Sequence, residues 1–326
     1  MRYLNRNKDS NNVETSVGAV IREAGERTTT VAHDLVSTSC GDSVRRVQEV
    51  PFEQALRETC AVALDQGSHW TIVVDADLLV SPKRIRRFVD FAQRAPESVF
   101  QIQGFILDKL TGTVRVGGPR LYRTRLLSEA LKHIPADGDC DRPESRGLIK
   151  GMERAGYRCA VAPLIIASHD YEQYYRDIYR KCYVHSRKHM KWLGQFAAYW
   201  RDHRDQDADF RIAMHGMWHG LDSDESLRLD IRTLPTEIED VLQQEGLKEK
   251  TALPSGAISA EDVERTLAES PAVIEWERRR SATIWQRLGR KCDEIGWWRI
   301  APWGVGKGLQ RIGLNVEQMV TKRTPE

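Results

Sequence analysis

Residues 70–77, Trp-Thr-Ile-Val-Val-Asp-Ala-Asp, place two aspartates at the end of a short, mostly apolar run. The run predicts a buried strand, whereas aspartate is depleted from strands and costs several kcal/mol to bury unpaired. Two carboxylates that leave a strand together, with one small residue between them, can both face a divalent cation. Asp75 and Asp77 therefore predict either a metal site, which implies a phosphate-bearing substrate, or a pair of caps for the next helix.

The segments around these aspartates predict a doubly wound α/β sheet. We expect a strand at 17–21, helices at 29–35 and from Phe52 to Gly67, a strand at 70–74, and a helix that starts at Ser81-Pro82. Sheets of this kind bind ligands at the carboxyl ends of their strands. The predicted position of Asp75 and Asp77 therefore agrees with their chemistry.

Further strands are predicted at 99–103 and 160–167, with a hairpin over 105–116 that turns at Gly112. Gly117-Gly118 follow, and they predict either close approach of a ligand to the backbone or an ordinary tight turn. The strand at 160–167 leads into Ser168-His169-Asp170, and residues 171–200 predict one or two helices. After residue 200 the sequence becomes strongly charged, which indicates a soft domain boundary.

Composition narrows the class of protein. The 49 Lys and Arg residues nearly balance the 47 Asp and Glu residues and are spread along the chain, which argues against a nucleic-acid partner. The six cysteines form no CxxC pair, so a reducing, cytoplasmic location is expected. No run approaches the roughly 20 apolar residues that span a bilayer. The Trp-rich segment 296–303 predicts either peripheral contact with the inner face of a membrane or packing against the catalytic domain.

Taken together, these residues resemble nucleotide-sugar glycosyltransferases of the GT-A fold, and within them the inverting family 2 type. Asp75-Ala76-Asp77 looks like the DxD motif, which in that fold holds a divalent metal against the donor diphosphate. Three further segments occur in the matching order: Glu26-Arg27-Thr28 resembles the nucleotide loop, Gly117-Gly118 the glycine-bearing segment before the acceptor region, and His169 the late histidine of the metal site.

Glu144-Ser145, followed by Ala155-Gly156-Tyr157, is similar to the Glu-Asp motif of this family. Ser145 stands where the family carries a second acidic residue. The general base would then be Glu144, or Asp141 or Asp139 upstream, or the site would be inactive. The segment 188–192 only faintly resembles the QxxRW box of processive members, which disfavours a polymerase.

The resemblance implies a GT-A catalytic domain over residues 1–200, Rossmann-like with a mixed sheet flanked by helices, and a mostly helical extension over 201–326. It also implies sugar transfer from a UDP-sugar to a saccharide or lipid-linked acceptor, with inversion. Mn²⁺ or Mg²⁺ would be held by Asp77 and His169, with Asp75 at the metal or the ribose. The remaining expected site residues are Glu144 and Asp141 in catalysis and Arg27, Gly117 and Gly118 at the donor.

Two alternatives stay open. A catalytically silent GT-A-like binding or scaffold module would explain Ser145. A sugar-phosphate nucleotidyltransferase uses a similar sheet and acidic pair, but it should carry a glycine-rich loop with a lysine for the triphosphate. Gly25-Glu26-Arg27 is too poor in glycine for such a loop.

Overall fold

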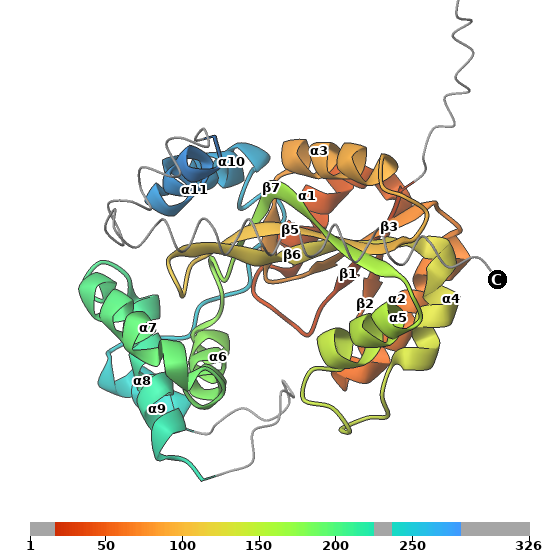
Figure 1. Ribbon diagram of the computed structural model, residues 1–326. Coiled ribbons are helices and arrows are strands. Elements are labelled where there is room, and N and C mark those ends of the chain that lie inside the picture. Colours follow the sequence, from red (N-terminus) through yellow and green to blue (C-terminus); the bar gives the residue numbers. More distant parts are fainter. Residues whose placement is uncertain (1–16, 225–236, 282–326) are drawn as a thin grey trace, which may run out of the picture. The chain divides into compact units, whose positions relative to one another are not determined.

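The computed structural model describes residues 17–224 and 237–281, and it contains a mixed seven-stranded sheet flanked by helices (Figure 1). The strands are β1 (Val17–Arg22), β2 (Val44–Val47), β3 (Trp70–Asp75), β4 (Leu78–Val80), β5 (Val99–Asp108), β6 (Thr113–Arg123) and β7 (Arg158–His169). The α-helices are α1 (Thr29–Cys40), α2 (Phe52–Gln66), α3 (Pro82–Gln93), α4 (Leu127–Ala130), α5 (Lys150–Arg154), α6 (Tyr175–Lys188), α7 (Met190–His203), α8 (Ala208–Asp222), α9 (Ile238–Gln244), α10 (Ala260–Glu269) and α11 (Pro271–Ser281). Short helices of other types are η1 (Gly41–Ser43), η2 (Thr124–Leu126), η3 (Leu131–His133) and the π-helix η4 (Pro143–Ile149).

The strand order is β2-β1-β3-β6-β5-β7-β4. Strands β2, β1 and β3 are parallel, and β5 and β7 are also parallel to each other. Strand β6 is antiparallel to both β3 and β5, and β4 is antiparallel to β7. Strands β1, β2, β3, β5 and β7 therefore all run in one direction, and their carboxyl ends lie along one edge of the sheet.

Helices cover both faces of this sheet, which explains why the run at 70–74 is mostly apolar and buried throughout. Val20 and Val73 pack with Leu56 and Cys60 of α2 in one core. Ile72, on the opposite face of β3, is equally buried, and α1 and α3 pack on that side of the sheet (Figure 1). The predicted doubly wound architecture is therefore confirmed.

A second hydrophobic core joins helices α6, α7, α8 and α9, which confirms a helical region after the sheet. Trp200 of α7 is buried in this core, and its indole N–H donates to the Leu110 carbonyl at 2.5 Å. The compact unit that contains the sheet continues to Val273. The boundary expected near residue 200 therefore falls within α7, inside this helical core.

The predicted hairpin is present but longer than expected. Strands β5 and β6 are joined at Gly112, whose φ of 63° matches the predicted turn.

In the described ranges, which leave out 1–16, 225–236 and 282–326, no helix has the length and apolarity needed to cross a bilayer. The Trp-rich segment 296–303 lies outside the described residues.

Candidate functional site

Four of the strands that run in one direction each end in a charged or titratable residue. These residues are Arg22 at the end of β1, Asp75 at the end of β3, Asp108 at the end of β5 and His169 at the end of β7. In register, Arg22 lies opposite Asp75 and Asp108 lies opposite His169. Since ligands bind at the carboxyl ends of such strands, this edge is the candidate site.

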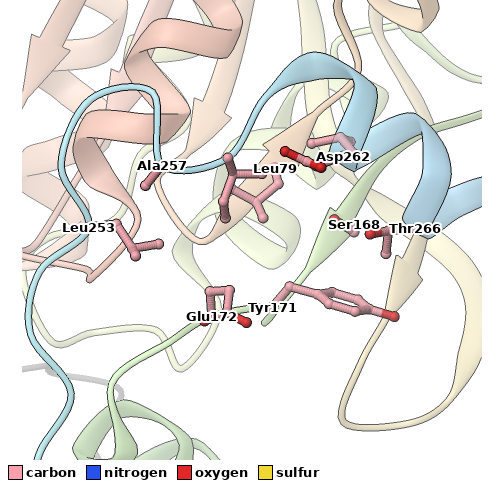
Figure 2. A pocket seen from close by; sticks show the side chains of 10 residues that line it. Leu79, Ser168, Tyr171, Glu172, Leu253, Ala257, Asp262 and Thr266 are labelled. Carbon is pink, nitrogen blue, oxygen red and sulfur yellow. The ribbon is translucent and has the colours of Figure 1, made fainter.

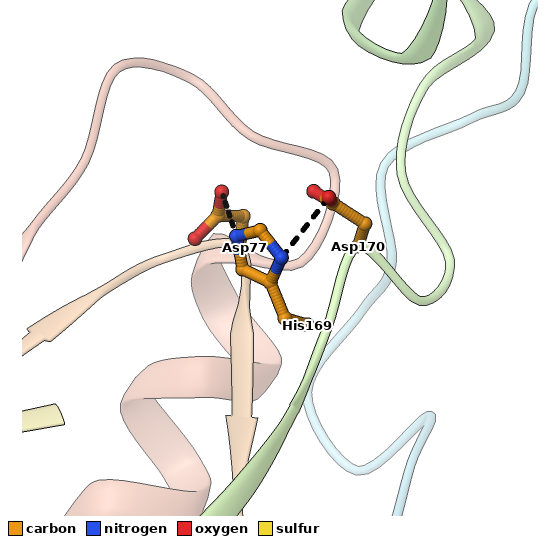
Figure 3. Close-up of side chains that lie close together, drawn as sticks. All are labelled: Asp77, His169 and Asp170. Atoms are coloured by element: carbon orange, nitrogen blue, oxygen red, sulfur yellow. Dashed lines mark ion pairs between the residues drawn. The ribbon is translucent and has the colours of Figure 1, made fainter. Parts of the chain in front are cut away.

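Asp77, His169 and Asp170 form what we call the acidic cluster (Figure 3). Each offers one potential ligand atom, and these atoms all lie within 4.8 Å of one another. His169 Nε2 is 3.3 Å from Asp77 Oδ2, and His169 Nδ1 is 3.0 Å from Asp170 Oδ2 and 3.1 Å from Asp108 Oδ2. The structure thus brings the predicted pair Asp77 and His169 together and adds two further aspartates.

Backbone contacts fix the two chain segments that carry the cluster. The Asp170 N–H donates to the Asp77 carbonyl at 3.3 Å, immediately beyond the pairing of β4 with β7. Asp170 has a left-handed backbone (φ 62°), a conformation that aspartate tolerates better than most residues. Thr28, at the N-cap position of α1, makes no side-chain cap hydrogen bond; it donates its hydroxyl to the Ala76 carbonyl at 2.6 Å and accepts from Gln173.

The charges of the cluster are strongly coupled. Burial raises the pKa of Asp77, but the Lys181 ammonium and His169 outweigh burial and hold this pKa well below its usual range. Burial lowers the pKa of His169, but Asp170 and Asp77 raise it well above its usual value. Burial raises the pKa of Asp170, but His169 and Lys181 hold this pKa below its usual value. These shifts favour the charged forms of Asp77, Asp170 and His169.

The donor set of the acidic cluster fits a divalent cation such as Mn²⁺. Two carboxylates and one imidazole, all from neighbouring strand ends, match the oxygen-rich coordination that Mg²⁺ and Mn²⁺ prefer, with one nitrogen that Mn²⁺ accepts more readily. Binding through His169 requires the neutral imidazole, so a bound metal would displace its proton. Asp108 would then be the outer partner that orients His169, and Arg115 lies 2.6 Å from Asp108.

Asp75 belongs to a second group, which we call the arginine cluster: Arg22, Asp75, Arg120, Tyr122 and Glu144. Arg22 Nε lies 2.8 Å from Asp75 Oδ1, and Arg22 Nη1 lies 2.9 Å from Glu144 Oε1. Arg120 Nη2 lies 2.9 Å from Glu144 Oε2 and its Nη1 is 3.8 Å from Asp75. The two arginines thus bridge the two carboxylates, and Tyr122 donates to Glu144 at 2.9 Å.

Glu144 lies in the π-helix η4 and is almost fully buried. Burial raises its pKa, but Arg120 and Arg22 reverse this effect, so the pKa of Glu144 lies below its usual value. Both carboxylate oxygens are already occupied, Oε1 by Arg22 and Tyr122 and Oε2 by Arg120. This environment favours a structural role for Glu144, and its role as general base stays a prediction.

Gly117 and Gly118 lie inside β6 rather than in a turn after it. The pairing of β5 with β6 shifts between Gln103 and Gly104, which leaves Gly118 and Pro119 as a bulge. Gly118 has φ 75°, and a Cβ on it would lie 2.2 Å from Ile106 Cγ2. The bulge places the next residue, Arg120, in register with Val73 of β3, beside Asp75.

Arg27 and Asp141 contact residues outside both clusters. Arg27 binds the Glu172 carboxylate at 2.6 Å and the Thr251 carbonyl at 2.7 Å, so it ties the segment between β1 and α1 to the chain before α10. The Asp141 side chain is 72% exposed and lies 3.8 Å from Arg146. The structure therefore gives Asp141 no contact with Glu144, Asp75 or the acidic cluster.

A cavity of about 300 Å³ adjoins the site (Figure 2). Its walls are Leu79, Ser168, Tyr171, Glu172, Leu253, Ala257, Ile258, Asp262, Val263 and Thr266. None of the acidic-cluster residues lines it. Since successive strand residues point to opposite faces, Ser168 reaches the cavity from the side opposite to His169.

The sequence analysis did not predict three residues that contact Asp77 or His169, namely Asp108, Asp170 and Lys181. The dipeptide His169-Asp170 was a visible signal for Asp170, and Asp108 could have been found as another acid at a strand end. Lys181 had no local signal, because it reaches Asp77 and Asp170 from helix α6 through tertiary packing.

No protein-family model matches the sequence, and no curated protein matches it. Among solved structures, the chain is similar to a mannosyltransferase from Pyrobaculum calidifontis in complex with GDP-Man and Mn²⁺, at 14% identity and a TM-score of 0.34 over 71% of this chain and 79% of that one. A glycosyltransferase involved in glycosylation of the major capsid of PBCV-1 gives 12% identity and 0.35 over 47% and 92%. The 4-diphosphocytidyl-2C-methyl-D-erythritol synthase of Anaerococcus prevotii gives 12% and 0.36 over 47% and 88%. These likenesses are too remote to transfer chemistry to this chain.

Proposed function

We propose that this protein is a metal-dependent glycosyltransferase that moves a sugar from a nucleoside-diphosphate sugar, with UDP-sugar as the expected donor. The observation that carries the proposal is the meeting of Asp77, His169 and Asp170 at the carboxyl edge of a doubly wound sheet. A histidine between two carboxylates at this edge suits a cation that binds a diphosphate.

A divalent cation at the acidic cluster would supply electrostatic stabilisation for the leaving diphosphate. Asp77, His169 and Asp170 would hold it, and Asp108 would fix the orientation of the imidazole. Asp75 keeps a 36% exposed carboxylate that Arg22 fixes from behind. In this position Asp75 can accept hydrogen bonds from the hydroxyls of the ribose or the transferred sugar.

Removal of the acceptor proton is proposed for Glu144, which resembles the family base by position and is ionised, as a base must be. Glu144 can accept a proton only after Arg22, Arg120 or Tyr122 releases one of its oxygens. This occupied state favours a second candidate, a catalytically silent nucleotide-sugar binding module. The acceptor is proposed to be a saccharide or a lipid-linked sugar, and a membrane-surface location would go with the latter.

The test is release of nucleoside diphosphate from a panel of UDP-, GDP- and other nucleotide sugars with Mn²⁺, where water replaces the unidentified acceptor. Asp77→Ala should lower the rate at least about 100-fold, because a preorganised electrostatic contact to the leaving group is lost. Asp90→Ala, at an exposed site on α3, is the matched control and should keep wild-type activity.

Three other outcomes separate the rival functions. Binding of a nucleotide sugar without turnover would favour the silent module. Formation of pyrophosphate from a nucleoside triphosphate and a sugar phosphate would favour the nucleotidyltransferase. Equal rates for wild type and Asp77→Ala would contradict the proposed metal site.

A further inference from the structure

Lys181 of α6 contacts the same carboxylates that are proposed to hold the metal. Its ammonium lies 3.0 Å from Asp77 Oδ2 and also forms an ion pair with Asp170 Oδ1. The Lys181 side chain is 20% exposed and that of Asp170 is 3% exposed, so water screens this contact only weakly. A side-chain cation therefore already pairs with two of the three candidate ligands.

An ammonium and a divalent cation make competing demands on these oxygens. The ammonium uses its N–H donors on Asp77 and Asp170. A metal needs the same oxygens at about 2.0–2.6 Å, which would bring two positive charges within a few ångströms of each other. Strong binding of both cations then requires an additional anion at the site.

The long side chain of Lys181 can reach such an anion without movement of its helix. The flanking residues Tyr179 and Cys182 are fully buried, and α6 packs closely on Gly216 of α8, so the backbone of α6 is held in place. Lysine carries a compact point charge on a flexible four-carbon stem and is a frequent phosphate ligand.

Resting on the proposed function, we propose that Lys181 competes with a divalent cation for Asp77 and Asp170, and that a nucleoside diphosphate relieves this competition by accepting the ammonium. Lys181 thereby couples metal binding to donor binding. Without the diphosphate the metal binds weakly, and with the diphosphate Lys181 becomes a second positive contact for it.

The test is a titration of the full chain with Mn²⁺, with free Mn²⁺ followed by electron paramagnetic resonance, alone and with saturating UDP or GDP. Lys181→Met should bind Mn²⁺ alone roughly 10-fold or more tightly than wild type, within the usual range of coupling between two ligands. UDP or GDP should tighten Mn²⁺ binding more in wild type than in Lys181→Met. Lys181→Arg keeps the charge and should bind Mn²⁺ as weakly as wild type.

Lys83→Met, at an exposed position of α3, controls for loss of a lysine elsewhere and should leave Mn²⁺ affinity unchanged. If circular dichroism shows that Lys181→Met does not fold, Lys181→Gln replaces it with the same expectation. Equal or weaker Mn²⁺ binding by the neutral variant, or no Mn²⁺ binding by either protein, overturns the inference. An affinity gap that UDP and GDP leave unchanged overturns the coupling to the diphosphate. If the protein releases no nucleoside diphosphate from any nucleotide sugar but Lys181→Met still binds Mn²⁺ more tightly, the proposed function is wrong and the competition stands.

Discussion

Replacement of Glu144 by glutamine should strongly destabilise the fold, although the two side chains have nearly the same shape. Glu144 is the common partner of Arg22 and Arg120, each at 2.9 Å, and the Arg22 side chain is 5% exposed. In Glu144→Gln both arginines keep their charge, but only Asp75 remains to neutralise them. Removal of one partner from a buried ion pair typically costs about 3–5 kcal/mol, and we expect a loss in this range.

Urea unfolding at pH 7 measures this loss directly, with the midpoint and the m-value fitted together. Asp141→Asn is the matched control, because this second acidic candidate is 72% exposed and its substitution should change stability by less than about 0.5 kcal/mol. An unfolding free energy of Glu144→Gln within the same margin of wild type would refute the buried ion cluster. It would also reopen the interpretation of Glu144 as a free base.

Three further predictions concern other parts of the fold. Gly118→Ala should cost roughly 2–5 kcal/mol in thermal unfolding, from a left-handed backbone and a steric overlap, whereas Gly138→Ala, with φ 83° and open space, should cost only about 1–2 kcal/mol. Burial raises the pKa of Glu26 from 4.5 to about 7, so the folded protein binds a proton that the unfolded chain has lost. The unfolding free energy should therefore fall by up to about 3 kcal/mol as the pH rises from 4.5 to 7, and Glu26→Gln should remove this fall in a pH series of denaturation curves. Trp200→Ala should lower stability by about 3–5 kcal/mol in guanidinium, whereas Trp218→Ala, 60% exposed, should be nearly neutral; equal losses would contradict the helical core.

The sequence predicted most of the sheet, although not β2 or β4, and it predicted the strand edge at which Asp77 and His169 meet. Apolar runs bounded by glycine, proline and caps predicted β1, β3, α2 and α3, because each of these elements follows local rules. Ser81 caps α3 by accepting from the Arg84 N–H, and Gly67 ends α2 with a left-handed backbone, both as predicted. The charged and titratable residues at strand ends then follow from the topology, which explains why the predicted pair Asp77 and His169 lies together.

The remaining features depend on tertiary contacts that no local pattern encodes. Arg120 meets Asp75 only because a bulge interrupts the pairing of β5 with β6. Glu144 meets both arginines from a π-helix, whose hydrogen-bond pattern the sequence does not reveal. Lys181 reaches the acidic cluster because the fold brings α6 to this edge of the sheet. From its sequence context alone, this lysine is indistinguishable from one exposed to solvent.

We propose that Asp77, with His169 and Asp170, holds a cation that binds the donor diphosphate. Isothermal titration calorimetry of UDP and GDP, with and without Mn²⁺, tests this role of Asp77. We predict binding that Mn²⁺ strengthens in the wild-type protein and that Mn²⁺ leaves unchanged in Asp77→Ala. Binding of neither nucleotide, or an equal effect of Mn²⁺ on wild type and Asp77→Ala, would contradict the claim.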